Sequence, residues 1–207
     1  MPTRLETRDL AWRDTWRAAR LLADAYADGA IWAAAGRMTR WQRQVSLTLL
    51  YLAELLICRW EKGFAIGAAR GDRLEGVLIS YTAGERPTPW WGWVLRAPAC
   101  LFAGPVAVAR CVRISGDLER LKPREPHVWH AVLGRRGDTP GVGYVLLRAG
   151  QARADSLGLP GYLETSAGDE QVEINVLLGW SVVDEYVLRT GKVVRTMWRD
   201  CPALVTS

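Results

Sequence analysis

The most constraining feature of this 207-residue sequence is an apolar segment, 127–134, that runs through a glycine-containing loop into a helical pattern. The segment reads HVWHAVLG and is predicted to be a buried strand, and RRGDTPGVG follows it directly. From Gly141 to Leu157 the apolar residues recur at helical spacing, so a helix is expected to begin where the loop ends. Strands that alternate with helices in this way are typical of α/β proteins.

The loop itself has the chemistry of an anion-binding site. Gly141 and Gly143 allow the main chain to approach a ligand closely. The helix that follows offers free N–H groups and the positive end of its dipole, and Arg135 and Arg136 add two positive charges. Together these features predict a pyrophosphate site, although glycines at a helix start can also serve tight packing alone. A Rossmann dinucleotide site is disfavoured, because Leu146 stands where its third glycine would be.

The rest of the chain predicts further strands and helices around this unit. Strands are expected at residues 4–10, 64–69, 74–81, 161–165, 182–188 and 193–198, and helices at 11–29, 39–60 and 169–178. Five residues of the first helix are expected to share one buried face, namely Trp12, Trp16, Ala19, Ala23 and Tyr26. The stretch from 90 to 121 is apolar but carries Pro98 and Pro105, which predicts a broken helix.

Composition narrows the class of protein. With 49% hydrophobic and 24% charged residues, the chain is expected to form one globular domain over residues 1–207. It has no run of about 20 apolar residues, the length that a spanning helix needs. The first residues, MPTRLETRDL, lack the pattern of a signal peptide, so a cytoplasmic protein is expected.

Charge and metal ligands argue against two other classes. Lys and Arg outnumber Asp and Glu by 27 to 22, a net charge of +5, but the basic residues are spread singly, so no nucleic-acid partner is expected. The four cysteines form no CxxC pair, which disfavours a zinc ribbon. His127 and His130 would face opposite sides of a strand and could not share a metal, so none is expected.

Several segments resemble the GNAT superfamily of acyl-CoA-dependent N-acyltransferases. They are HVWHAVLG with DTPGVG, then YVLLRAGQARADSLGLPGYLETS, then LLGWSVVDEYVL. The resemblance is good over residues 123–199 and loose over the first 85, and 86–122 resembles the helical insertion of puromycin-acetyltransferase-like members. It implies an α/β GNAT fold, in which helices flank a mixed, twisted and splayed sheet of about seven strands.

The resemblance also implies a cosubstrate and where it binds. Acetyl-CoA or another short acyl-CoA would lie between the strand 127–134 and the strand of Glu164, without a metal. Main-chain groups of Val132 and Leu133 would pair with the pantetheine and polarise the thioester carbonyl. The implied cofactor-binding residues are Val132, Leu133, Arg135, Arg136, Gly137, Gly141, Val142, Gly143 and Tyr144.

Catalysis is where the chain departs from the family. The acceptor amine must lose a proton before it attacks, and His130 or Glu164 is expected to take it, directly or through water. The family's tyrosine, which protonates the leaving thiolate, corresponds to Asn175, and asparagine is not an acid. Tyr186 is one alternative proton donor. Asp138 replaces the usual Gln or Arg of the loop, which is unfavourable beside a pyrophosphate.

The predicted reaction is acyl transfer, most simply acetyl, to an amine of a small molecule by direct attack in a ternary complex. Four tryptophans are expected to wall the acceptor pocket, namely Trp90, Trp91, Trp93 and Trp129, although covering the core or wedging into a membrane surface would also explain tryptophans in the insertion. By analogy the insertion suggests antibiotic modification or biosynthesis, in a monomer or homodimer without a membrane partner. The alternative is a catalytically silent GNAT-fold binding module that lacks the general-acid tyrosine.

Overall fold

The computed structural model shows a single seven-stranded sheet in the order β1-β2-β3-β4-β5-β7-β6. It describes residues 4–29, 38–61, 63–82, 90–137, 139–166, 168–188 and 191–202. The strands are β1 (Leu5–Asp9), β2 (Gly63–Arg70), β3 (Arg73–Thr82), β4 (Val128–Arg135), β5 (Gly161–Thr165), β6 (Ser181–Val187) and β7 (Val193–Arg199). Neighbouring strands are antiparallel except β4 and β5, which are parallel. The expected mixed sheet of about seven strands is therefore confirmed.

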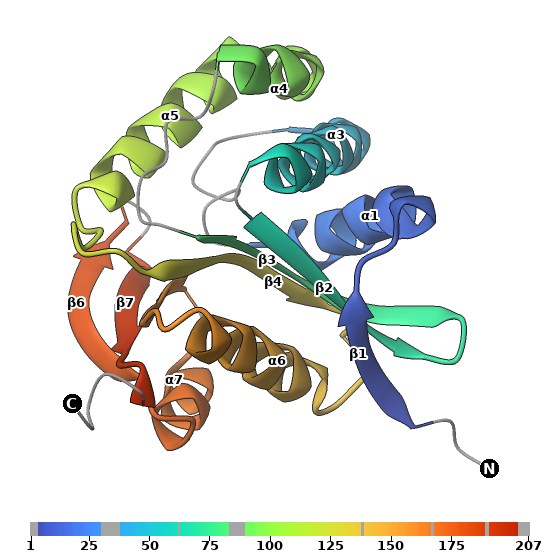
Figure 1. The fold of residues 1–207 in the computed structure, drawn as a ribbon. Helices are drawn as coiled ribbons and strands as arrows, with labels where there is room; N and C mark the ends of the chain where they lie inside the picture. Colours follow the sequence, from blue (N-terminus) through green and yellow to red (C-terminus); the bar gives the residue numbers. More distant parts are fainter. Residues whose placement is uncertain are drawn as a thin grey trace.

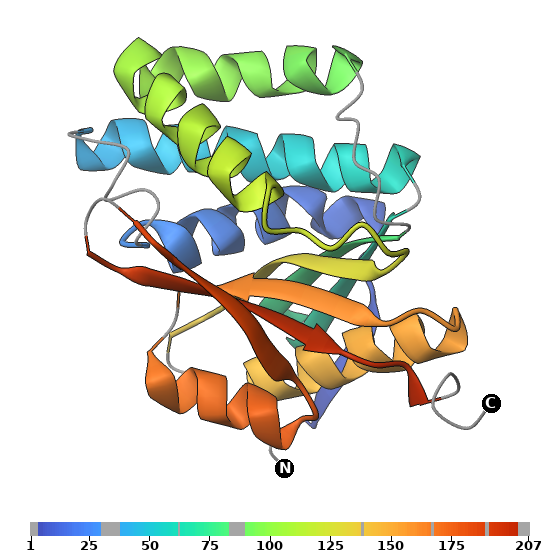
Figure 2. The same cartoon turned by 90° about the vertical axis from the view of Figure 1, so that its left-hand side faces the viewer.

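Helices cover both faces of the sheet (Figure 1). The helices are α1 (Thr15–Tyr26), α3 (Arg40–Trp60), α4 (Trp90–Ala103), α5 (Pro105–Glu119), α6 (Val142–Ser156) and α7 (Asp169–Leu177). The first four lie on one face, where α4 forms an outer layer above α3, and α6 and α7 lie on the other (Figure 2). None of the helices in the described part of the chain is both long enough and apolar enough to span a membrane.

Local sequence explains several of these boundaries. Thr39 and Gln42 form a capping box at the start of α3, in which the side chain of each accepts a bond from the other's main-chain N–H. Gly104, with φ of 81°, separates α4 from α5, and Pro105 takes the first position of α5. The predicted broken helix is thus two helices, and Pro98 lies within the first of them.

The expected buried face of the first helix is partly wrong. A short 3-10 turn, Trp12–Asp14, precedes α1, so Trp12 is not part of that helix. Trp12 and Trp16 are 60% and 52% exposed, whereas Ala19 and Ala23 are fully buried. The buried residues of α1 are small or aliphatic, because the helix lies close against both the sheet and α3.

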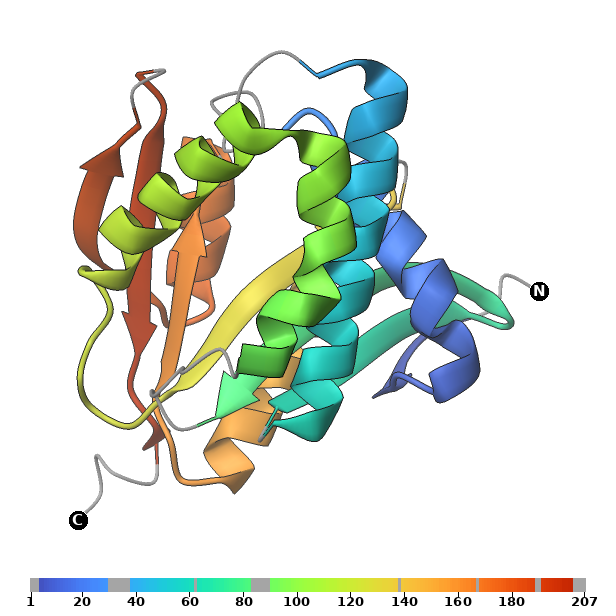
Figure 3. The same ribbon diagram turned by 90° about the horizontal axis from the view of Figure 1, so that it is seen from above.

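The two parallel strands stay together for only three residue pairs. Val128, Trp129 and His130 pair with Gly161, Tyr162 and Leu163, after which β4 and β5 separate (Figure 3). On its other side β4 remains paired with β3 as far as Arg135, with a register shift next to His130. The irregularity bends β4 at the point where β5 leaves it. The sheet is consequently open in the middle.

Candidate functional site

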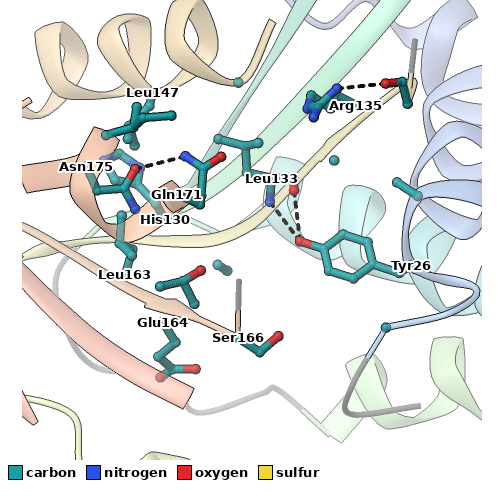
Figure 4. A pocket seen from close by; sticks show the side chains of 18 of the residues that line it. Tyr26, His130, Leu133, Arg135, Leu147, Leu163, Glu164, Ser166, Gln171 and Asn175 are labelled. Atoms are coloured by element: carbon teal, nitrogen blue, oxygen red, sulfur yellow. Dashed lines mark hydrogen bonds between the residues drawn. The ribbon is translucent and has the colours of Figure 1, made fainter. Parts of the chain in front are cut away.

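A cavity of about 860 Å³ lies where β4 and β5 separate. Its walls come from the ends of both strands, the loop after β4, the last turn of α1, the first turn of α6, and α7 (Figure 4). The volume is in the range of small-molecule and cofactor sites. The opening in the sheet therefore coincides with a space large enough for a ligand.

The cavity is lined by charges of both signs. The positive side chains Arg73, Arg135 and Arg136 come from β3, β4 and the loop after β4. The carboxylates Asp24, Asp28 and Glu164 come from the end of α1 and from β5, and Lys192 precedes β7. Such a lining suits a ligand that carries an anionic group and a separate cationic or polar group.

A buried carboxylate holds the loop after β4 in place. Glu75 on β3 is only 3% exposed, and it accepts a hydrogen bond from the Thr139 hydroxyl at 3.0 Å. Arg136 donates from its main-chain N–H to the Glu75 carbonyl at 2.9 Å, and from Nε to the Leu74 carbonyl at 3.1 Å. Arg73 Nε lies 3.2 Å from the Glu75 carboxylate. The loop is thus anchored to the neighbouring strand before any ligand binds.

The N-terminus of α6 completes this part of the cavity. Gly141 is the N-cap with φ of 78°, a conformation that favours glycine, and Gly143 and Tyr144 of the first turn line the cavity. The exposed Arg135 guanidinium bonds only loosely to nearby carbonyls, at 3.1 Å from Gly137 and 3.3 Å from Arg136. Free helical N–H groups and arginines together favour a phosphate group here. Asp138 lies outside the described residues.

A tyrosine hydroxyl fills part of the opening beside β4. Tyr26, the last residue of α1, donates to the Leu133 carbonyl at 2.9 Å and accepts from the Leu133 N–H at 3.3 Å (Figure 4). Burial raises the pKa of this phenol, which stays protonated near neutral pH. Both main-chain groups of Leu133 therefore point away from β3 and toward the opening.

His130 lines the cavity from its buried side. Its Nδ1 lies 2.8 Å from the Ser80 hydroxyl, its ring makes an edge contact with Trp180, and its buried Nε2 has no hydrogen-bond partner among the described residues. Burial, with a smaller contribution from Arg199, lowers the pKa of His130 to about 3. The imidazole is consequently neutral, and a weak base, at physiological pH.

Two further polar groups line the cavity near α7 and β5. Asn175 is 4% exposed and accepts a hydrogen bond from Gln171 Nε2 at 3.3 Å. Glu164 is half-buried and accepts from the Tyr162 hydroxyl at 3.2 Å. Glu164 carries a carboxyl group and Asn175 an amide, so Glu164 is the one of the two that can exchange a proton. No three His, Cys, Asp or Glu side chains of the described residues are grouped so as to hold a metal ion.

Comparison with known proteins gives a consistent fold. No protein-family model matches the sequence, and no curated protein matches it. Among solved structures, a Corynebacterium glutamicum protein described as histone acetyltransferase HPA2 and related acetyltransferase has a TM-score of 0.70 at 15% identity, covering 97% of each chain. An aminoglycoside 6′-acetyltransferase type Ii gives 0.54 at 13% identity, with 95% of this chain and 97% of that chain covered. The PaiA N-acetyltransferase of Thermoplasma acidophilum, in complex with coenzyme A, gives 0.53 at 12%, with 95% and 99% covered.

The chain has the GNAT fold. The splayed strands that the GNAT resemblance implied are β4 and β5, and six of the expected cofactor-binding residues line the cavity between them. These six are Leu133, Arg135, Arg136, Gly137, Gly143 and Tyr144. Gly141 and Val142 belong to the same helix start, outside the lining, and Val142 is fully buried against β3.

Val132, whose main-chain groups were expected to pair with the pantetheine, does not line the cavity. Its side chain packs on the α1 and α3 side of the sheet, and the β4 residues that line the cavity are His130, Ala131, Leu133, Gly134 and Arg135. The register shift next to His130 accounts for this, because it changes which β4 residues face the opening. A bulge of this kind leaves no mark in the apolar pattern of the segment.

None of the four tryptophans that were expected to wall the acceptor pocket lines this cavity. Trp90 and Trp93 are 79% and 54% exposed, Trp91 packs edge-on against Trp60, and Trp129 stacks on Tyr81. The cause is the placement of α4, which lies over α3 rather than over the opening. An ion pair fixes it there: Arg96 Nη2 lies 2.6 Å from the Glu54 carboxylate, and both residues are buried.

Tyr186 also lies outside the cavity lining, and its hydroxyl donates to Asp117 at 2.7 Å. Tyr26 and Glu75 were not expected at the site. Glu75 could have been found from the sequence, since it is a single carboxylate in the apolar strand LEGVLIS. The role of Tyr26 could not have been found in this way, because its partner Leu133 is 107 residues away in the sequence.

Proposed function

We propose that this GNAT-fold protein transfers an acyl group, most simply acetyl, from a CoA thioester to an amine of a small molecule. The observation that carries the proposal is the cavity between β4 and β5, which meets Arg135, Arg136 and the start of α6. It offers main-chain groups for an amide chain and a cationic, N–H-rich end for a pyrophosphate. The groups present therefore fit the two chemically distinct parts of CoA.

The proposed reaction is direct. The neutral amine nitrogen attacks the thioester carbonyl carbon, a C–N bond forms, the C–S bond breaks, and CoA leaves as a thiolate. Main-chain N–H groups of β4 beside the opening would stabilise the charge that develops on the carbonyl oxygen. No covalent enzyme intermediate is needed, because the amine attacks the thioester directly.

Glu164 is the side chain that we propose receives the amine proton, directly or through water. It is half-buried in the cavity lining and is a carboxylate at neutral pH. His130 remains the second candidate, but burial lowers its pKa to about 3, which disfavours proton transfer to it from an ammonium group. We propose that His130 instead shapes the floor of the cavity through Ser80 and Trp180.

The leaving thiolate requires no strong acid. A thiol has a pKa of about 8.5, so the thiolate can leave near neutral pH and take its proton from water. Asn175, which the GNAT resemblance puts in the place of the family's tyrosine, can donate only a hydrogen bond from its amide. The acceptor would enter beside Asp24, Asp28 and Lys192. An aminoglycoside-like amine is one acceptor to test.

The cytoplasmic location of the protein, and its state as a monomer or a homodimer, stay predictions.

The experiment that tests this function is release of free CoA thiol from acetyl-CoA in the presence of a panel of mono- and polyamines. Amine-dependent release, with the acetylated amine found by mass spectrometry, supports the proposal. The specific alternative is a module that binds acyl-CoA without transfer, which the buried Asn175 favours. Saturable binding of acetyl-CoA without thiol release across the panel would support that alternative.

A further inference from the structure

The hydroxyl of Tyr26 makes the two hydrogen bonds that a peptide group of an adjacent strand would make with Leu133. It donates to the carbonyl at 2.9 Å and accepts from the N–H at 3.3 Å. These main-chain groups lie beyond the last residue pair of β4 and β5, so β5 does not reach them. One side-chain hydroxyl therefore substitutes for the missing strand.

We infer that the Tyr26 hydroxyl occupies the subsite of a secondary amide of the acyl-carrying ligand, and that this amide displaces it on binding. A secondary amide carries one N–H and one carbonyl, which match the carbonyl and N–H of Leu133. The inference rests on the proposed function, because the pantetheine arm of CoA is the amide-containing chain expected in this cavity.

The ligand amide must displace the Tyr26 hydroxyl because Leu133 has only one main-chain N–H to donate. The Leu133 carbonyl has two lone pairs and can accept from two partners, but its single N–H makes one good hydrogen bond. A ligand amide that pairs fully with Leu133 must therefore take the N–H from Tyr26. The Tyr26 hydroxyl and the ligand amide compete for the Leu133 N–H, and this competition lowers the observed affinity for the ligand.

The surroundings of Tyr26 show why the hydroxyl reaches β4. A Cβ on Gly134 would meet Leu22 Cδ2 at 2.6 Å, so the glycine lets α1 lie close against the strand. The ring of Tyr26 packs on Tyr51 with 5.5 Å between centroids. The backbone at this end of α1 is held by the Gly29 N–H and by Arg43, which bond the carbonyls of Tyr26 and Ala27. Rotation of the side chain could thus free Leu133 without unwinding the helix.

The test is calorimetric titration of the full chain with CoA in the wild type, in Tyr26→Phe and in Tyr51→Phe. Tyr51→Phe is the matched control, because it removes a hydroxyl from the same core cluster but lies outside the cavity lining. Tyr26→Phe is expected to bind CoA roughly tenfold more tightly than the wild type, since one competing hydrogen-bond partner is gone. Tyr51→Phe is expected to bind as the wild type does.

Equal or weaker binding by Tyr26→Phe, with normal binding by the wild type, overturns this inference and leaves the proposed function standing. Failure of all three proteins to bind CoA contradicts the proposed function instead. Should Tyr26→Phe not fold, amide exchange at Leu133 and solvent labelling of the Tyr26 ring in the wild type decide: displacement predicts that the Leu133 amide stays protected when CoA binds while solvent exposure of the Tyr26 ring increases. A ring equally shielded with and without CoA contradicts the displacement.

Discussion

The buried carboxylate of Glu75 and the hydroxyl of Thr139 form a 3.0 Å hydrogen bond that ties the loop after β4 to β3. The two residues are 64 positions apart in the sequence. Because Thr139 immediately precedes the Pro140-Gly141 start of α6, this bond fixes where the helix N-terminus points. The proposed phosphate end of the cavity is therefore organised by a side chain that does not line it.

Replacing Thr139 with valine tests that relationship. The substitution keeps the shape but leaves a buried carboxylate oxygen without this donor, so we expect the free energy of unfolding to fall by about 1–3 kcal/mol. The affinity for CoA should fall as well, roughly three- to tenfold, because the loop loses one of its anchors. Urea unfolding and calorimetry measure the two effects. Thr7→Val on the exposed part of β1 is the control, and similar losses in both variants would contradict the account.

Arg135→Gln should weaken CoA binding without affecting folding. The guanidinium is exposed, and the hydrogen bonds that it makes among the described residues are to nearby carbonyls, so its removal costs little stability. Loss of one charge near a pyrophosphate is expected to lower the affinity about five- to twentyfold at low salt, and less at high salt. Arg148→Gln, on an exposed position of α6 outside the cavity lining, should bind CoA normally. Equal affinities of the two variants would argue against a phosphate site at Arg135.

The order of the elements could be predicted from the sequence and the open sheet from the GNAT resemblance, whereas the cavity lining could be predicted only in part. The glycine loop and the apolar run before it are local features of the sequence. They were enough to predict β4, α6 and the position of the two arginines between them. The contacts Tyr26–Leu133 and Thr139–Glu75 join residues far apart in the chain, and nothing local identifies them. The position of the α4 tryptophans could not be predicted for a related reason. The residue that fixes this helix, Glu54, is far from it in the sequence.

The pKa of His130 predicts a dependence of stability on pH. The pKa is about 3 in the folded protein and about 6.5 in the unfolded chain, so between these values the unfolded chain binds one proton more. Stability should therefore fall as pH falls below about 6.5, and the histidine should account for about 2 kcal/mol of the loss by pH 4.5. Urea unfolding of His130→Asn should show a shallower slope over this window. Identical slopes in variant and wild type would show that the histidine is not buried in its neutral form.

Two glycine substitutions should change stability in opposite directions. A Cβ on Gly76 would overlap Val142 Cγ1 and lie 2.9 Å from Leu146 Cδ1, so Gly76→Ala must push α6 away from β3. We expect a loss of about 1–3 kcal/mol. Gly116 in α5 has open space around it, so Gly116→Ala should be neutral or stabilising by up to about 1 kcal/mol. Thermal unfolding of both variants is the measurement, and a tolerated Gly76→Ala would contradict the close contact of α6 with the sheet.

Glu164→Gln distinguishes a catalytic carboxylate from a structural one. If Glu164 receives the amine proton, kcat should fall about ten- to a hundredfold at neutral pH while the affinity for CoA is unchanged. The loss should shrink at high pH, where more of the amine is already neutral. Glu185→Gln, an exposed carboxylate of β6 paired with Arg195, is the control. An unchanged kcat would assign the proton to water or to another group.

The most direct test of the whole account is calorimetric titration of the purified wild-type protein with acetyl-CoA, with 3′-dephospho-CoA and free pantetheine as comparisons. Because the cavity joins the edge of β4 that we propose binds an amide to two arginines and the start of α6, the account predicts saturable binding of one acetyl-CoA per chain, with free pantetheine binding far more weakly. Absence of binding at millimolar acetyl-CoA would contradict it, and would mean that the glycine loop and its arginines serve the fold alone.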